Sequence, residues 1–273
     1  MASLSLSIVT YNTELDFLDK CIKSLEKSCE LALSSSIIGQ VSLYVIDNSV
    51  NHSIFEQVKK SVNTSWTHGE VYFIETDKNL GYGNAHNIAI QEISSDYHLA
   101  LNPDVDINDN TIIKAINYLD KNTDVALIAP YVVNENDDYL YLCKRYPNIL
   151  VLLLRGFFTN SLQNLFDKKL STYEMRDIDI EKENKDILIS SGCFMFFRTS
   201  ELLKLKGFCS KFFLYFEDFD LSYRMSAMSK IAYVPEVKIV HHGGYAAAKG
   251  LKHIVLFCLS SITFFNRYGW KLN

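Results

Sequence analysis

The segment Asn102–Asp106 (Asn-Pro-Asp-Val-Asp) directly follows the apolar run Tyr97–Leu101. Asp104 therefore comes just after a predicted strand, beside a turn that Pro103 stiffens, and Asp106 lies two residues further on. Carboxylates at such a strand end are well placed to hold a hard divalent cation. A turn capped by an aspartate is the structural alternative.

Three more carboxylates occupy four consecutive positions later in the chain, at Glu217, Asp218 and Asp220. Such groups repel one another unless a cation, an arginine or a proton relieves them. If the segment is helical, Asp220 and Arg224 lie one turn apart and pair, which leaves Glu217 and Asp218 near the N-terminal end. The start of an ordinary helix would explain this segment as well as a functional site would.

Two further segments carry weaker signals. His241 and His242 follow a predicted strand and supply imidazoles without thiols, which fits either a metal site or packing. The segment Asn79–Asn84 (Asn-Leu-Gly-Tyr-Gly-Asn) could wrap its backbone around a pyrophosphate, although a single Gly-x-Gly is weak evidence for this.

Strand and helix patterns alternate through the first half of the chain and position these residues. This order predicts an α/β fold with a mostly parallel, Rossmann-like sheet covered by helices. The predicted strands are Leu4–Thr10, Val41–Ile46, Val71–Ile74, Tyr97–Leu101, Val125–Ala129, Ile187–Phe197 and Ile231–Val234. The predicted helices lie around 15–25, 88–93 and 112–119, with a C-terminal helical segment at 246–273. The densely charged segment 174–186 is predicted to be mobile and on the surface.

Ligands of such sheets bind outside the carboxyl ends of the strands. Three of these ends are polar in this sequence: Thr10-Tyr11-Asn12, Asp47-Asn48 and Asn102-Pro103-Asp104. We therefore expect one functional site along this edge of the sheet.

The composition sets further bounds. The 273 residues are 48% apolar, which is enough for a large core, and the formal charge of −5 gives no general attraction to nucleic acid. Six cysteines without a C-x-x-C pair indicate a reducing compartment. A signal-peptide pattern and a run long enough to span a bilayer are both missing. The sequence thus predicts a cytoplasmic protein that could still touch the inner face of a membrane.

Seven motifs in order resemble those of the family 2 inverting glycosyltransferases of the GT-A fold, especially the bacterial rhamnosyltransferase-like branch. The resemblance covers nearly the whole chain. Its motifs are Ser7–Asn12, Val45–Ser49, Asn79–Asn84, Leu101–Asp104, Ser191–Cys193, Glu217–Arg224 and His241. It implies a single domain over 1–273, in which 1–110 bind the nucleotide sugar, 111–245 form the acceptor and catalytic half, and 246–273 form the helical segment.

The resemblance also implies roles for individual residues. Residues on the nucleotide-sugar side are Thr10, Tyr11, Asn12, Asp47, Asn79, Gly81, Asn84, Asn102 and Asp104. Asp47 would accept the N3–H of uracil or thymine. Asn102-Pro103-Asp104 matches the D-x-D metal motif with asparagine in place of the first aspartate, and Asp104-Val105-Asp106 is a second reading of it. The implied Mn²⁺ or Mg²⁺ ligands are Asp104 or Asp106 together with His241, or His242 as the fallback.

On the acceptor side the resemblance places Gly192 and Arg224, with Asp218 as the catalytic base and Glu217 as its competitor. It favours dTDP-L-rhamnose as the donor and a cell-surface polysaccharide such as O-antigen, or its polyprenyl-diphosphate-linked precursor, as the acceptor. Another UDP- or dTDP-sugar is the first alternative. A non-catalytic sugar-binding protein on the same fold is the second, and it would be expected to have lost Asp104 or Asp218.

Overall fold

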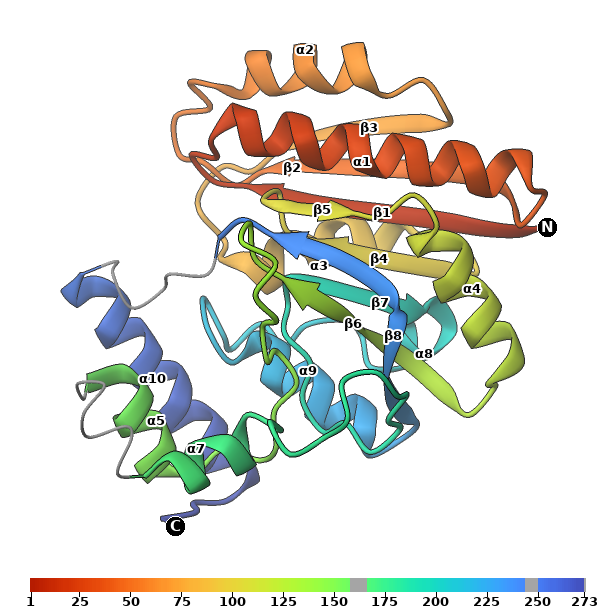
Figure 1. Ribbon diagram of the computed structural model, residues 1–273. Coiled ribbons are helices and arrows are strands. Elements are labelled where there is room, and N and C mark those ends of the chain that lie inside the picture. The colour runs from red at the N-terminus through yellow and green to blue at the C-terminus, as the bar shows by residue number, and fades with distance from the viewer. Residues whose placement is uncertain (158–165, 244–249, 273) are drawn as a thin grey trace.

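The computed structural model describes residues 1–157, 166–243 and 250–272 (Figure 1). Its strands are β1 (Ala2–Thr10), β2 (Ile38–Asp47), β3 (Glu70–Glu75), β4 (Tyr97–Leu101), β5 (Val105–Ile107), β6 (Val125–Val133), β7 (Phe194–Arg198) and β8 (Lys230–His241). Its helices are α1 (Leu15–Ser34), α2 (Phe55–Ser65), α3 (Tyr82–Glu92), α4 (Thr111–Lys121), α5 (Ile149–Phe157), α7 (Asp167–Tyr173), α8 (Thr199–Lys204), α9 (Glu217–Ser226) and α10 (Leu251–Tyr268).

The described strands form one sheet in the order β3-β2-β1-β4-β7-β6-β8-β5. Strands β1 to β4 pair in parallel, as β6 and β8 do, whereas β7 is antiparallel to both neighbours and β5 is antiparallel to β8. The expected α/β fold with a mostly parallel sheet is confirmed. The carboxyl ends of β1, β2 and β4 share one edge, as parallel pairing requires.

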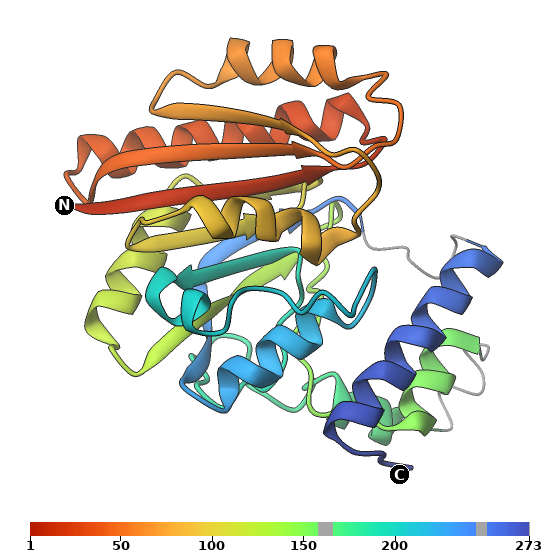
Figure 2. The ribbon, with the colours of Figure 1, turned by 180° about the vertical axis from the view of Figure 1, so that it is seen from behind.

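Helices cover both faces of the sheet, which explains why its central strands are apolar on both sides. Helices α1, α2 and α4 pack with one face in a first buried cluster, and α3, α8 and α9 pack with the other face in a second. Figure 2 shows α3 and α9 on the face opposite α1. The sheet is therefore a rigid support for whatever lies at its edge.

Three predicted boundaries are wrong. Helix α3 begins at Tyr82 instead of Ile88, and β7 takes up only the last part of the predicted strand 187–197. Strand β8 continues past Pro235 to His241 because its register with β6 shifts there, from Val234 opposite Pro130 to Lys238 opposite Tyr131. Such a bulge accommodates a residue that has no N–H to donate.

Helices α5, α7 and α10 lie together beside the sheet, on the same side as the carboxyl ends of β1 and β2 (Figures 1 and 2). They share a third apolar cluster, which includes Phe212 and Phe216 from the segment before α9. The predicted C-terminal helix is confirmed over Leu251–Tyr268, whereas 246–249 lie outside the described residues. The prediction of an exposed segment from 174 onward is wrong at Glu174, which is buried among cationic side chains.

Candidate active site

The carboxyl ends of β1 and β2 meet as predicted. Thr10 lies opposite Asp47 in the parallel register, and the Asn48 amide donates to the Thr10 carbonyl at 2.9 Å. Asn12 has a left-handed backbone (φ 48°), and its amide donates to Ser49 Oγ at 3.1 Å. Tyr11 between them is exposed, so its ring is free to meet a ligand at this edge.

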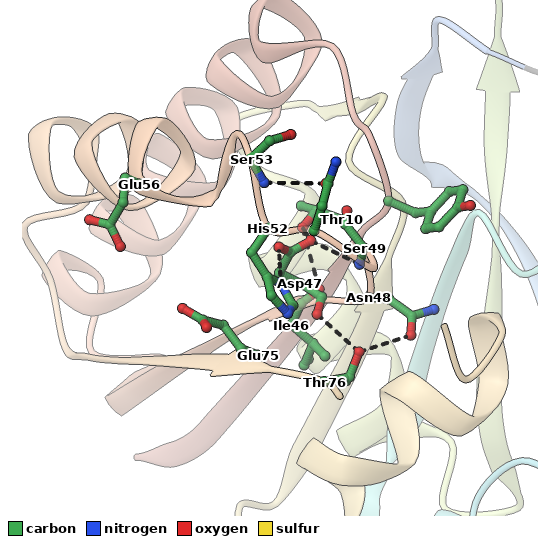
Figure 3. A network of polar contacts seen from close by, with 12 residues as sticks. Thr10, Ile46, Asp47, Asn48, Ser49, His52, Ser53, Glu56, Glu75 and Thr76 are labelled. Carbon is green, nitrogen blue, oxygen red and sulfur yellow. Dashed lines mark hydrogen bonds and ion pairs between the residues drawn. The ribbon is translucent and has the colours of Figure 1, made fainter. Parts of the chain in front are cut away.

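Asp47 is held by a network of hydrogen bonds (Figure 3). Its Oδ1 accepts from the Ser49 amide at 3.1 Å and from Thr10 Oγ1 at 3.4 Å, and its Oδ2 lies 2.7 Å from His52 Nδ1. The hydrogen bond to Asp47 raises the pKa of His52, and Glu75 adds to this effect. Asp47 is only 1% exposed, and the network fixes the position of its carboxylate.

The segment from 79 to 84 is a fixed turn that leads into α3. Asn48 organises it: Oδ1 accepts from the Leu80 amide at 2.8 Å, and Nδ2 donates to Asn79 Oδ1 at 3.0 Å. Gly81 has a φ of 81°, and a Cβ there would lie 1.8 Å from the Phe213 carbonyl oxygen, so only glycine fits. Asn84 Nδ2 caps the turn by donating to the Leu80 carbonyl at 3.0 Å.

Asp104 and His241 come together at the ends of β4 and β8. Asp104 Oδ1 lies 3.5 Å from His241 Nε2, and this buried oxygen has no hydrogen-bond partner among the described residues. Burial raises the pKa of Asp104, but the interaction with His241, together with contributions from the Asp104 amide and the Asn102 side chain, brings this pKa below its usual value, so the group stays ionised. Gly243 leaves room for the carboxylate, because a Cβ there would lie 1.9 Å from Asp104 Oδ2.

These atoms fit the predicted cation. A buried carboxylate oxygen without a partner, next to an imidazole nitrogen, is the mixed oxygen and nitrogen set that Mn²⁺ accepts. Within the described ranges no three His, Cys, Asp or Glu side chains are arranged to hold a metal. Asp104 and His241 would therefore supply part of a coordination shell, and further ligands would have to come from elsewhere.

Asp106 and His242, the second reading of the metal motif, contact each other. His242 Nε2 lies 2.8 Å from Asp106 Oδ2, and its Nδ1 lies 2.8 Å from Glu135 Oε1. The His242 ring also stacks on Phe17, with centroids 5.4 Å apart. Asp106 Oδ1, like Asp104 Oδ1, has no hydrogen-bond partner among the described residues. Both nitrogens of His242 are engaged, however, and this favours Asp104 and His241 as the metal-binding pair.

Gly192 and Cys193 connect the two groups of carboxylates. The Gly192 amide donates to Asp218 Oδ2 at 2.9 Å, and the Cys193 carbonyl accepts from the Asn102 amide at 2.9 Å. Tyr82 Oη donates to the Gly192 carbonyl at 2.5 Å. A Cβ on Gly192 would lie 3.3 Å from both the Asp218 side chain and the Tyr82 ring, so this position sits tightly between them.

Glu217 and Asp218 open helix α9. The two residues before them, Tyr215 and Phe216, have left-handed backbones (φ 68° and 63°), which is strained for aromatic residues and typical of functional sites. Glu217 is 5% exposed, and its Oε2 has no hydrogen-bond partner among the described residues. Burial and the charge of Asp218 raise the pKa of Glu217 to about 8.

Asp218 is in a different environment, although the two residues are adjacent. Its Oδ2 accepts from Gly192 and its Oδ1 accepts from the Phe219 amide at 2.9 Å. Burial raises the pKa of Asp218, and these two amides oppose the rise. The two amides favour the charged form of Asp218, whereas burial favours the neutral form of Glu217, so a proton shared by the pair is held preferentially by Glu217.

Asp220 and Arg224 form the predicted pair, with Nε 2.7 Å from Oδ2. Asp220 also accepts from Tyr268 Oη at 2.7 Å, which joins α9 to α10. The other Arg224 nitrogens donate to the carbonyls of Leu205 and Gly207 at 3.0 and 2.9 Å. These contacts give Arg224 a structural role, and its predicted acceptor-side role stays a prediction.

Sequence reasoning gave no role to several residues that the site uses. Tyr82 lies inside a recognised motif, but only the fold brings its hydroxyl to Gly192. His52 and Glu135 are ordinary loop residues in the sequence, and nothing in their spacing connects them to Asp47 or His242. Gly243, which follows the two histidines, could have been noted as a glycine beside a polar site.

Comparisons with known proteins bear on the family and the fold. The family described as Glycosyl transferase family 2 matches residues 5–202. An N-acetylglucosaminyl-diphospho-decaprenol L-rhamnosyltransferase of Mycobacterium tuberculosis is 22% identical over 191 residues, which cover 66% of this chain and 61% of that protein. The rhamnosyltransferase WbbL of Escherichia coli K12 is 24% identical over 173 residues, which cover 59% and 61%. The matched region thus spans about three fifths of these relatives.

Solved structures share the fold. GalNAc-T7 with UDP, GalNAc and Mn²⁺ superposes with a TM-score of 0.63 at 14% identity, covering 92% of this chain and 45% of that one. Staphylococcus aureus TarS 1–349 in complex with UDP gives 0.57 at 15% identity, covering 97% and 66%. The fold is the GT-A fold expected from the sequence. Because the family match extends over most of the chain, the protein belongs to glycosyl transferase family 2.

Proposed function

We propose that the protein transfers a sugar from a nucleoside diphosphate donor to a hydroxyl of a glycan acceptor, with inversion at the anomeric carbon. One observation carries this proposal: the dipeptide Gly192-Cys193 is bonded to Asp218 on one side and to Asn102, two residues before Asp104, on the other. This short segment thereby keeps the proposed base, Asp218, near Asp104, the carboxylate proposed to act at the donor phosphates. In this proposal residues 1–110 bind the donor, and 111–245 supply the acceptor side and the base.

Asp218 would take the proton of the acceptor hydroxyl as that oxygen attacks the anomeric carbon. Its two amide donors orient the carboxylate, and the proton on Glu217 keeps a second negative charge away from the nucleophile. Asp104 and His241 would hold Mn²⁺ or Mg²⁺, which when bound neutralises the charge that develops on the departing diphosphate. The base would act on the opposite face of the sugar from the leaving group, so the displacement needs no covalent sugar intermediate.

The best donor candidate is dTDP-L-rhamnose, and the best acceptor candidate is a cell-surface polysaccharide or a polyprenyl-diphosphate-linked glycan precursor. The printed names of the two rhamnosyltransferase relatives support this choice. A screen of UDP- and dTDP-sugars with Mn²⁺ tests it by product formation. Transfer from another UDP- or dTDP-sugar alone would change the donor, and transfer from none of them would contradict the proposal.

We expect Asp47 to select uracil and thymine diphosphates over those of guanine and cytosine. Each of its oxygens has a lone pair to spare for an imino N–H. Cytosine has no N3–H to donate, and guanine presents its N1–H from a larger ring, so either base would desolvate this buried carboxylate without a matched hydrogen bond, which costs roughly 1–3 kcal/mol. Calorimetry should show UDP and dTDP binding more tightly than GDP and CDP, and Asp47→Asn should abolish the difference. Glu56→Gln is the matched control, because Glu56 is an exposed carboxylate that pairs with Lys59. GDP binding as tight as that of UDP would rule this role out.

We also propose that α10 contacts the cytoplasmic face of a membrane. Leu251, Val255, Leu259 and Ile262 are exposed and lie on one face of this helix, a spacing typical of interfacial helices. No described helix is long and apolar enough to cross a bilayer.

This contact predicts binding to vesicles. Replacing Val255 and Leu259 with serine should weaken co-sedimentation with anionic phospholipid vesicles roughly tenfold or more, since each side chain would lose its burial in lipid. Met228→Ser is the matched control, because Met228 is an exposed apolar residue away from α10. Equal losses in both variants would show that α10 is not the contact.

A further inference from the structure

A cluster of cationic side chains surrounds the buried carboxylate of Glu174, which follows α7. Arg155 Nε of α5 lies 3.0 Å from Glu174 Oε1, and Lys144 Nζ lies 3.7 Å from the same oxygen. Arg176 Nε donates to Glu174 Oε2 at 2.8 Å, and its Nη1 lies 3.0 Å from Asp167. Three basic side chains therefore meet two carboxylates, which leaves one positive charge in excess when all three are protonated.

Lys144 carries this excess. Its side chain is 7% exposed, and its hydrogen bond goes to the Tyr141 carbonyl instead of a carboxylate. Burial lowers the pKa of Lys144 to about 7, and the charge of Arg155 contributes. The carboxylate oxygen nearest to the Lys144 ammonium is 3.7 Å away and also pairs with Arg155. A buried ammonium compensated only in this way is costly, and a bound anion would relieve that cost.

Tyr173 connects this cluster to the start of α9, the helix that carries Glu217 and Asp218. It is 4% exposed, its hydroxyl has no hydrogen-bond partner among the described residues, and the Lys144 Nζ and Arg155 Cζ atoms lie 5.8 and 5.7 Å from its ring centroid. Its ring belongs to the same apolar cluster as Phe216, the residue directly before Glu217. A buried hydroxyl without a partner requires an explanation, and a ligand oxygen supplies one.

We propose that Lys144, Arg155 and the Tyr173 hydroxyl bind a phosphate group of the acceptor, close to the hydroxyl that Asp218 activates. The planar guanidinium of Arg155 matches two phosphate oxygens, and Lys144 adds a buried point charge. Helix α10 packs Phe264 and Phe265 in the cluster of Tyr173 and exposes apolar side chains to solvent on another face. In this proposal those exposed side chains contact the lipid tail of the acceptor. This inference rests on the proposed function, since it assigns the acceptor side of the same site.

The first experiment measures binding of farnesyl diphosphate and of inorganic pyrophosphate by calorimetry. Arg155→Gln and Lys144→Met should each weaken binding about tenfold or more, whereas Arg145→Gln should not, because Arg145 is already matched by a two-point ion pair with Asp177. Tighter binding of farnesyl diphosphate than of pyrophosphate would identify a lipid-linked phosphate, and equal binding would identify a phosphate without a tail. Binding that is insensitive to Arg155 and Lys144 would overturn the proposal, since it would come from the donor side. Arg155 is partly exposed, so Arg155→Gln provides the test even if the buried Lys144 variant fails to fold.

The second experiment compares two acceptors, N-acetylglucosaminyl-diphospho-farnesol and octyl N-acetylglucosaminide. Arg155→Gln should lower kcat/KM for the first acceptor 10- to 100-fold, with little change for the second and an unchanged KM for the donor. Equal losses for both acceptors would indicate a structural role and contradict the inference. If the wild-type protein transfers to neither acceptor, the proposed function fails, and the binding experiment still decides whether the phosphate site exists.

Discussion

Asp218→Asn is expected to lower the rate of sugar transfer by ~10²–10⁴-fold, the usual contribution of a general base, while donor binding stays nearly unchanged. Asparagine keeps the size of the side chain, and its amide oxygen can still accept from Gly192, which holds Asp218 Oδ2 at 2.9 Å. The ability to accept a proton is lost, together with the negative charge and the hydrogen bond from the Phe219 amide to the second oxygen. The measurement is kcat with the donor saturating, and the donor Kd from calorimetry is the internal control.

Glu217→Gln is the matched variant, because the two carboxyls are neighbours in one coupled pair. Glu217 is the protonated member at neutral pH, since burial and the charge of Asp218 raise its pKa to about 8. A neutral amide therefore imitates it, and this variant should keep most of the activity. An inactive Glu217→Gln enzyme together with an active Asp218→Asn enzyme would assign the role of the base to Glu217. Two active variants would contradict catalysis by this pair.

The pH dependence follows from the same pair. A base works only when it is deprotonated, so activity is lost as the pH falls through the pKa of Asp218. Burial raises that pKa, so the acidic limb of kcat should lie above the range of an ordinary aspartate. An acidic limb at or below the ordinary aspartate range would contradict this assignment.

The parts of the site that sequence could predict are those fixed by strand geometry. Parallel strands end at a common edge, so the polar residues after β1 and β2 had to meet, and Thr10 does lie opposite Asp47. The pairing of Asp220 with Arg224 was equally accessible, because a helix places residues four apart on one side. The relative placement of Asp218 and Asn102 was not, since it depends on the hydrogen bonds that Gly192 and Cys193, directly before β7, make to both residues.

Glu174 shows why other parts could not be predicted. A dense run of charges suggests a solvated segment, but the cations that cover Glu174 come from positions 144, 155 and 176, which only the packing of α5 and α7 brings together. His52 is a similar case: its role depends on the loop after β2 folding back onto Asp47. Long-range charge neutralisation of this kind leaves no local pattern in a single sequence.

Asp104→Ala is expected to lower transfer by at least about 100-fold, because stabilising the charge on a leaving group commonly contributes on the order of 3 kcal/mol or more. The alanine variant also removes packing against Gly243, so Asp104→Asn should be measured beside it to separate loss of charge from loss of volume. Asp106→Asn is the matched control. Asp106 is already held by His242, and an amide oxygen can keep that contact, so activity should change little.

Metal removal gives an independent test of the same site. Chelation by EDTA should stop transfer and added Mn²⁺ should restore it, whereas the Asp104 and His241 variants should need more Mn²⁺ and bind it more weakly in the presence of UDP. The orphaned Asp104 oxygen, 3.5 Å from His241 Nε2, is the structural reason to expect both effects at this pair. His242→Ala separates the two histidines: a loss there equal to that of His241→Ala would shift the metal to the second pair. Full transfer in EDTA, or an Asp104→Ala enzyme as active as the wild type, would show that this carboxylate does not support a cation.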